Sequence, residues 1–202
     1  LCIGGGYNED DSEIDLRSGQ IRIHMHSHNG LAIGSFNGDA LIDISDKCKL
    51  ELTVSGIKVT GIGSCKGIAT ISSSADIAIS CTGAQAVAIG SLEDGEGSIY
   101  IKSGKLMMKM RSAKNSAIGA IKGNMNTRVE NADISIDSEG DEITGIGDAL
   151  GTGNVAIIDS AVIMKILAAN PKDIGTGSGD LKIVNSTVSS LINNKVITHS
   201  NI

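Results

Sequence analysis

The sequence has almost no aromatic residues and a single proline. Its 202 residues include one Phe, two Tyr and no Trp, whereas Gly occurs 26 times. Any core must therefore be aliphatic, because too few aromatic side chains are present to fill one. Apolar residues still make up 41% of the chain, which is enough for a sizeable core and argues against disorder.

The sequence also lacks the residues that several kinds of partner and location would require. The net charge is −6 and the 17 lysines and arginines form no cluster, so we expect no nucleic-acid partner. No apolar run approaches the roughly 18 residues of a spanning helix, so we expect no membrane insertion. We expect no signal peptide within this sequence. The chain opens inside a repeat, at Leu1-Cys2-Ile3-Gly4, and we expect it to be a piece of a longer protein.

The four cysteines do not form a recognisable pattern. Cys2, Cys48, Cys65 and Cys81 fall at different points of the repeat described below, and none belongs to a C-x-x-C pair. Neither a disulfide framework nor a cysteine metal site is therefore expected. We interpret these residues as small buried hydrophobes, with their redox state left open.

The abundant feature is the dipeptide Ile-Gly, which recurs at intervals of 27 to 30 residues. Its seven copies are Ile3-Gly4, Ile33-Gly34, Ile62-Gly63, Ile89-Gly90, Ile118-Gly119, Ile146-Gly147 and Ile174-Gly175. A fixed period of this length is the signature of a repeat architecture.

Each repeat contains apolar residues two apart, which is typical of strands with one buried face. Twelve residues before the Ile of each later copy stand Ile21, Leu50, Ile77, Leu106, Ile134 and Val162. An earlier strand in each unit has the inward pairs Ile14/Leu16, Ile42/Ile44, Ala69/Ile71, Ile99/Ile101, Thr127/Val129, Val155/Ile157 and Leu181/Ile183. The Ile-Gly segment supplies a third strand.

Three short strands in each unit, without helical periodicity, predict an all-β, single-domain right-handed parallel β-helix. This three-sided β-solenoid has about seven coils and covers residues 1–202. No coil can bury its apolar face alone, so stacking creates the core. Residues 188–202 contain no further Ile-Gly, and we expect an incomplete coil or a cap there.

Units with Ala-Ile-Gly or Gly-Ile-Gly at their centre, such as Ala32-Ile33-Gly34 and Gly61-Ile62-Gly63, resemble a known class of repeat. They are similar to the right-handed parallel β-helix (pectate-lyase-like) regions of bacterial surface and secreted proteins. The resemblance implies an extracellular or cell-surface location, although unpaired cysteines would equally suit the cytoplasm. The architecture hosts lyases, adhesins and non-catalytic binding domains, so it does not fix an activity.

The outward column of the first strand is the candidate ligand stripe. It is predicted to contain Asp15, Asp43, Thr70, Tyr100 and Arg128. Asp15 and Asp43 would stack as like charges one coil apart, an arrangement that a calcium ion would stabilise. Tyr100 beside Arg128 could offer a flat surface to a sugar. We predict no catalytic residue.

Two histidines form the candidate metal site. His24 and His26 are two apart on a strand and would project from the same face, a possible seat for zinc or nickel. The neighbouring coil places Thr53 and Ser55 beside them and adds no third ligand. An exposed polar face is the alternative interpretation.

Two further features of the outer surface suggest packing roles. Lys109, Asp137 and Lys165 follow one another on adjacent coils, as do Arg111 and Glu139, and such pairs would support the register. Small residues before each Ile, among them Ala88 and Ala117, suggest a bare outer ribbon on which another chain could pack. The alternative is that Gly is needed locally for a bend.

These features favour a non-catalytic binding, adhesion or spacer module of a larger bacterial surface protein. Its expected partner is a carbohydrate, held by the first-strand column, or another protein chain. One alternative is a polysaccharide lyase or hydrolase that uses Asp15 and Asp43 with calcium. A second is a structural or oligomerisation solenoid attached to a regulatory domain.

Overall fold

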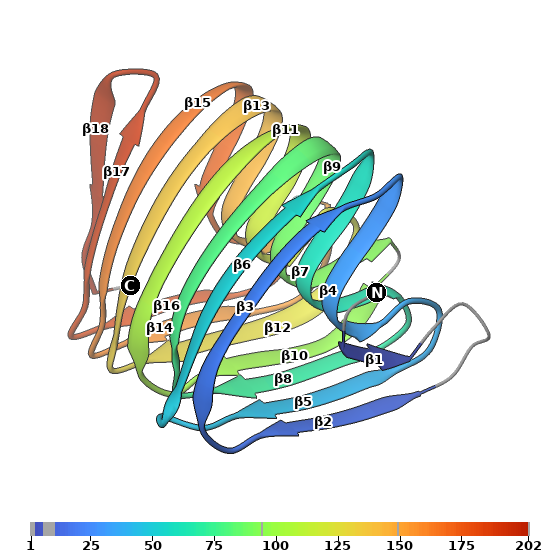
Figure 1. The fold of residues 1–202 in the computed structure, drawn as a ribbon. Coiled ribbons are helices and arrows are strands. Elements are labelled where there is room, and N and C mark those ends of the chain that lie inside the picture. Colours follow the sequence, from blue (N-terminus) through green and yellow to red (C-terminus); the bar gives the residue numbers. More distant parts are fainter. Residues whose placement is uncertain (1–2, 6–10, 94, 149, 202) are drawn as a thin grey trace.

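The computed structural model describes residues 3–5, 11–93, 95–148 and 150–201. It is an all-β, single-domain parallel β-solenoid of about seven turns, and the described residues include no helix. Long strands lie side by side from one end of the molecule to the other, above a second sheet of shorter strands (Figure 1). The predicted solenoid is thereby confirmed, while its right-handed and three-sided form stays a prediction.

The strands form two sheets. The shorter sheet has seven strands, which are β2 (Ser12–Leu16), β5 (Ala40–Ile44), β8 (Ala69–Ser73), β10 (Gly95–Ile101), β12 (Gly123–Glu130), β14 (Val155–Ile158) and β16 (Leu181–Val184). The longer sheet contains β1 (Ile3–Gly5), β3 (Gly19–His26), β4 (Asn29–Ser35), β6 (Cys48–Ser55), β7 (Lys58–Lys66), β9 (Asp76–Glu93), β11 (Gly104–Ala120), β13 (Ala132–Asp148), β15 (Ala161–Ile174), β17 (Thr187–Ile192) and β18 (Lys195–His199). From β9 to β15, the expected second and third strands of a coil run on as one long strand.

The Ile-Gly repeat sets the register of the stack. Each Ile aligns with the Ile of the next coil, from Ile3 opposite Ile33 to Ile146 opposite Ile174. A Cβ added at Gly90 would overlap the carbonyl oxygen of Gly119, and the φ of Gly90 is 137°. Both the close stacking and the positive φ favour glycine, so the dipeptide marks a corner that only glycine fits without strain.

Aliphatic columns run through the interior of the coils. The predicted column at Leu50, Ile77, Leu106, Ile134 and Val162 is almost fully buried, whereas Ile21 in the first coil is half-buried. Burying one such side chain contributes about 1.5–3 kcal/mol. The stack of coils therefore creates the core that the sequence predicted.

The small residues before Ile33, Ile62, Ile89, Ile118 and Ile146 point inward, which corrects the expected bare outer ribbon. Ala88 and Ala117 are fully buried in the main core. A Cβ added at Gly61 would lie 3.1 Å from Cγ2 of Ile79, another core residue. These residues are small because they share the interior with the neighbouring Ile. Their side chains are not available to a partner.

One first-strand register also needs correction. Ile71 aligns with Ile42 and Ile99, and Ser73 aligns with Ile44 and Ile101. The inward pair of β8 is therefore Ile71/Ser73 rather than Ala69/Ile71. A serine at a core position concealed the register, because the sequence pattern sought an apolar residue there.

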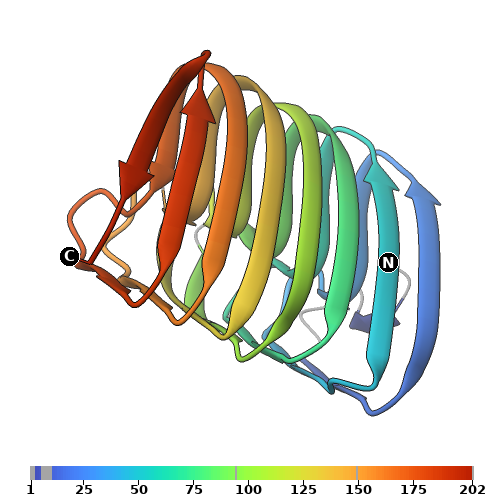
Figure 2. The ribbon, with the colours of Figure 1, turned by 90° about the vertical axis from the view of Figure 1, so that its left-hand side faces the viewer.

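The C-terminal end is closed by a hairpin. β17 adds to β15 in parallel, and β18 then turns back to pair with β17 in the antiparallel direction. Figure 2 shows this hairpin at the C-terminal end of the stack. Nε2 of His199, on β18, lies 2.7 Å from Oδ2 of Asp173. Asp173 occupies the inward position that Ala or Gly holds in earlier coils, so His199 gives the carboxylate a partner.

Three cysteines lie within the described residues, and Cys2 lies outside them. Cys48, Cys65 and Cys81 are buried free thiols. Burial raises the pKa of Cys65 to about 11 and that of Cys81 to about 12. These three residues therefore pack as small hydrophobes, as the sequence predicted.

Candidate functional site

Four hollows are described for this structure, and the one with the greatest volume lies on the outer face of the Ile-Gly half of the long strands. It has a volume of about 910 Å³. It is lined by Gln85, Leu92, Glu93, Lys114, Asn115, Ile121, Lys122, Glu142, Ile143, Thr144, Leu150, Ala169, Asn170, Pro171 and Lys172. A second hollow of about 250 Å³ shares Leu92 and Glu93 and continues toward Asn29 and Phe36. We call the two together the outer groove.

One rim of the outer groove is a column of polar side chains in register. It consists of Asn29, Lys58, Gln85, Lys114, Glu142 and Asn170, contributed by successive coils. The other rim follows the Ile-Gly corner and includes Lys66, Glu93 and Lys122. Between the rims, the outward residues Val87, Ser116 and Thr144 are small or medium in size and almost fully buried. Longer side chains on both sides of this shallow floor produce the hollow.

Lysines outnumber carboxylates in the outer groove. Its lining includes five lysines, namely Lys58, Lys66, Lys114, Lys122 and Lys172, and two glutamates, Glu93 and Glu142. Nζ of Lys114 lies 2.9 Å from Glu142, and Glu93 is ion-paired with Lys58 across the groove. The excess of positive charge contrasts with the net charge of −6 for the whole chain. An anionic ligand would therefore be attracted to this face.

A buried carboxylate supports the second rim. Asp148 is fully buried, and its two oxygens accept hydrogen bonds from the backbone N–H groups of Ala120 (2.8 Å) and Met125 (2.6 Å). These bonds fasten both ends of the loop that carries Ile121 and Lys122. Burial raises the pKa of Asp148 to about 6, although the hydrogen bonds and the charge of Lys172 oppose the rise.

Sequence reasoning missed Asp148, although a signal was present. The residue after Ile-Gly is small or neutral in the other coils, for example Ser35, Ser64 and Ala120. In the first coil, the Ser35 hydroxyl accepts a hydrogen bond from the N–H of Gly38 and so fastens its own loop. Ala120 has no polar side chain, and the carboxylate of the next coil takes over this task. The signal was that Asp148 is the acidic residue at the position after Ile-Gly, where the other copies of the repeat have uncharged residues.

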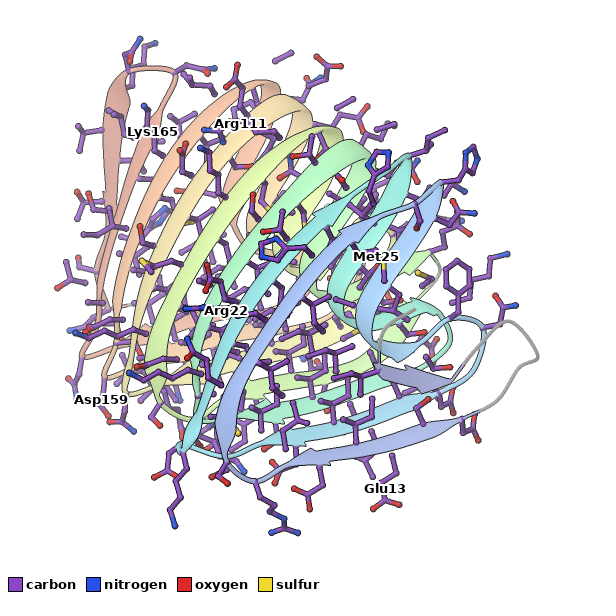
Figure 3. The ribbon with its side chains drawn as sticks, viewed as in Figure 1. Glu13, Arg22, Met25, Arg111, Asp159 and Lys165 are labelled. Carbon is purple, nitrogen blue, oxygen red and sulfur yellow. The ribbon has the colours of Figure 1, made fainter. Side chains whose placement is uncertain are left out.

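The structure aligns most of the predicted ligand stripe. Asp15 lies opposite Asp43, and Tyr100 lies opposite Arg128. Thr70 does not belong to this column, because Ser72 aligns with both Asp43 and Tyr100. Thr70 lies two residues earlier on β8. The stripe lies on the outer face of the seven-stranded sheet, from which Glu13 also projects (Figure 3).

Each carboxylate of the stripe has a cation beside it. Asp15 is ion-paired with Arg17, and Oδ1 of Asp43 lies 3.9 Å from Nζ of Lys102. The like charges of Asp15 and Asp43 are therefore compensated without a shared calcium ion. The calcium prediction thereby loses its electrostatic reason and stays a prediction.

Tyr100 is held by its neighbours. Its hydroxyl donates a hydrogen bond to Glu130, which raises the pKa of the phenol. Lys102 Nζ and Arg128 Cζ lie 5.6 Å and 5.7 Å from the ring centroid. Both distances are within cation–π range. A sugar that stacks on this ring would have to compete with these two cations.

The histidines lie on β3 and β6 passes beside them. Nδ1 of His26 is 2.9 Å from the hydroxyl of Ser55, and His26 lines a hollow of about 630 Å³ with His28 and Ile57. His24 aligns with Thr53, as predicted. Among the described residues, no group of three or more His, Cys, Asp or Glu side chains could hold a metal ion. The two-histidine site stays a prediction without a third ligand.

The predicted charge ladders are present in part. Arg111 lies 3.4 Å from Glu139, as predicted. A further pair on the same face joins Arg22 Nε to Glu51 at 2.8 Å. Asp137 bonds Arg111 (2.7 Å) rather than Lys109, its neighbour in the column. Figure 3 shows Arg22, Arg111 and Lys165 on the outer side of the longer sheet.

No family model, curated protein or solved structure matches this chain. The described residues include no helix with the length and hydrophobicity required to cross a membrane. The function is therefore inferred from the geometry and charge of the site.

Proposed function

We propose that this chain is a non-catalytic binding module whose outer groove holds an acidic carbohydrate chain. The observation that carries the proposal is the lining of five lysines and two glutamates on a chain of net charge −6. Carboxylate or sulfate groups on a glycan would gain from this local positive charge, whereas a neutral glycan would not. At physiological ionic strength, charges on the protein and the glycan attract each other mainly within a Debye length of about 8 Å. Direct contact in the groove should therefore contribute more to affinity than long-range attraction.

The shape of the groove suits a linear polymer. The first rim passes through six coils, from Asn29 to Asn170. At a spacing of about 4.8 Å between coils, this rim is roughly 24 Å long. Asn29 and Asn170 supply amide groups that can donate to and accept from sugar hydroxyls. Recognition would rest on charge and hydrogen bonds rather than on aromatic stacking.

The groove is a better candidate than the first-strand stripe. Asp15 and Asp43 lie on an open face beside Arg17 and Lys102, and neither lines one of the four hollows described for this structure. The same ion pairs weaken the case for a lyase or hydrolase that would use these two carboxylates. We therefore favour binding over catalysis.

The wider biological setting is part of the same proposal. The Ala-Ile-Gly and Gly-Ile-Gly corners support a relationship to pectate-lyase-like repeats, and that relationship supports a place in a larger bacterial surface protein. Acid-glycan binding would then serve adhesion. A spacer role is the alternative if no glycan binds.

Affinity electrophoresis in gels that contain polygalacturonate, alginate or neutral dextran tests the proposal. We expect retardation by the two acidic polymers only, and weaker retardation as salt is added. Replacing Lys114 and Lys122 by Gln should weaken binding by about tenfold or more, which corresponds to about 1.4 kcal/mol. Lys47→Gln serves as the control, because it removes one positive charge from an exposed turn outside the groove.

Three outcomes would contradict the proposal. Equal binding of dextran and the acidic polymers would exclude charge selection. Loss of binding in Arg128→Ala, with normal binding in the groove variant, would transfer the site to the first-strand stripe. Absence of binding to every polymer would favour the spacer.

A further inference from the structure

The outer face of the longer sheet segregates its charges by strand. On β11, the outward residues include Lys105, Lys109 and Arg111, whereas on β13 the aligned residues are Asp133, Asp137 and Glu139. Arg111 already bonds Asp137 and Glu139 within the chain. Among the described residues, Lys105, Lys109 and Asp133 form no ion pair. A row of cations thus lies directly beside a row of anions.

The same face carries exposed apolar side chains. Ala78, Met107, Ser135 and Ile163 align across β9, β11, β13 and β15. Met107 is 62% exposed and Ile163 is 65% exposed. A hollow of about 380 Å³ surrounds Ala78 and is lined by Glu51, Lys105 and Met107 among others. The face therefore has an apolar projection at β15 and a hollow at β9.

These features are self-complementary about one axis. A two-fold axis parallel to the strands, midway between β11 and β13, would place β11 of one chain over β13 of another and β9 over β15. Lys105 would then face Asp133, and Lys109 would face Asp137. Ile163 would enter the hollow at Ala78. Symmetry repeats every one of these contacts, as in an isologous interface.

We propose that this face binds a second copy of the chain in a two-fold dimer. The eight residues 104–111 extend about 26 Å, and the eight strands that the axis pairs off, from β3 to β18, extend about 34 Å, so the face covers roughly 880 Å². A stable interface buries about 800 Å² on each partner, and packed sheets align within about 30°. The outer groove lies on the other half of the long strands and stays open in this dimer.

Sedimentation velocity and native mass spectrometry of the whole chain test the dimer. The wild type should dimerise below about 100 µM, the range in which specific complexes form. Ile163→Asp should raise the dissociation constant at least about tenfold, because a charge would enter an apolar contact. Leu41→Asp is the matched control, since Leu41 is 51% exposed on β5 of the other sheet, outside the proposed interface. Circular dichroism melts would establish that both variants fold.

A charge exchange tests the position of the axis. Lys105→Asp and Asp133→Lys should each weaken the dimer by placing like charges face to face. The double variant should recover most of the wild-type affinity, because it restores opposite charges. A wild type that is monomeric at every concentration would overturn the proposal, as would an Ile163→Asp variant that dimerises normally. A double variant no stronger than either single one would exclude this axis.

Discussion

Replacing Asp148 by Asn should change how the stability of this fold depends on pH. Burial raises the pKa of Asp148 from 3.8 to about 6. The difference corresponds to about 3 kcal/mol. Because the folded chain binds the proton more tightly than the unfolded chain, Asp148 lowers the free energy of unfolding as the pH rises from 3.8 to about 6. Above about pH 6, the free energy of unfolding falls no further through Asp148.

The Asp148→Asn variant separates this effect from the hydrogen bonds. An amide has one oxygen, so either Ala120 or Met125 would lose its acceptor, at a cost of about 1–3 kcal/mol at every pH. Relative to wild type, the variant should be less stable near pH 4 and should gain about 3 kcal/mol between about pH 4 and 7. For a chain of this length, that gain corresponds to roughly 6–12 °C in melting temperature.

Urea unfolding of wild type and variant between about pH 4 and 7.5 measures the difference directly. Asp141→Asn, at an exposed position on the same strand, is the control and should show no comparable pH-dependent gap. A constant difference between wild type and Asp148→Asn over the whole range would refute the reasoning. It would mean that Asp148 ionises in the folded chain as it does in the unfolded one.

Two further substitutions test the ends and corners of the solenoid. His199→Ala should destabilise the C-terminal hairpin by about 1–2 kcal/mol, because the half-buried Asp173 loses its contact with the imidazole and keeps the backbone N–H of Ile174. Hydrogen exchange in β17 and β18 should then accelerate, and unchanged exchange would contradict this role. The His199 contact lowers the pKa of Asp173 against the effect of burial, so the contribution is present at neutral pH and lost as the pH falls through that pKa. Gly90→Ala should cost more than Gly19→Ala in thermal melts, since both positions have positive φ but only Gly90 abuts a backbone oxygen, that of Gly119. Equal costs would mean that φ alone selects glycine.

Most of the fold could be predicted because its periodicity is local in the sequence. The spacing of Ile-Gly gives the length of a coil, and apolar residues two apart give the inward columns. The prediction went wrong where a core position is polar. Ser73 stands where other coils have Leu, Ile or Val, so the register of β8 moved by two residues and Thr70 was assigned to the wrong column.

The candidate site was harder to predict, because it depends on side chains from different coils and on the shape between them. The sequence drew attention to Asp15, Asp43 and Tyr100, whose charges and ring are unusual in the chain. In the structure, Asp15 is ion-paired with Arg17 and Asp43 with Lys102. The Tyr100 hydroxyl donates a hydrogen bond to Glu130. Ordinary lysines and amides form the outer groove instead, and no single one of them is distinctive.

The sequence by itself determined the aliphatic core, the length of the coil and the need for glycine at its corner. These properties follow from residues that recur at one spacing, and stacking requires no further information. Only the tertiary structure decided which outer face is hollow, that small residues such as Ala88 and Ala117 before the Ile point inward, and that Asp148 fastens the loop of the preceding coil. Each of these depends on the direction of a side chain relative to a neighbouring coil, which the order of residues alone does not specify.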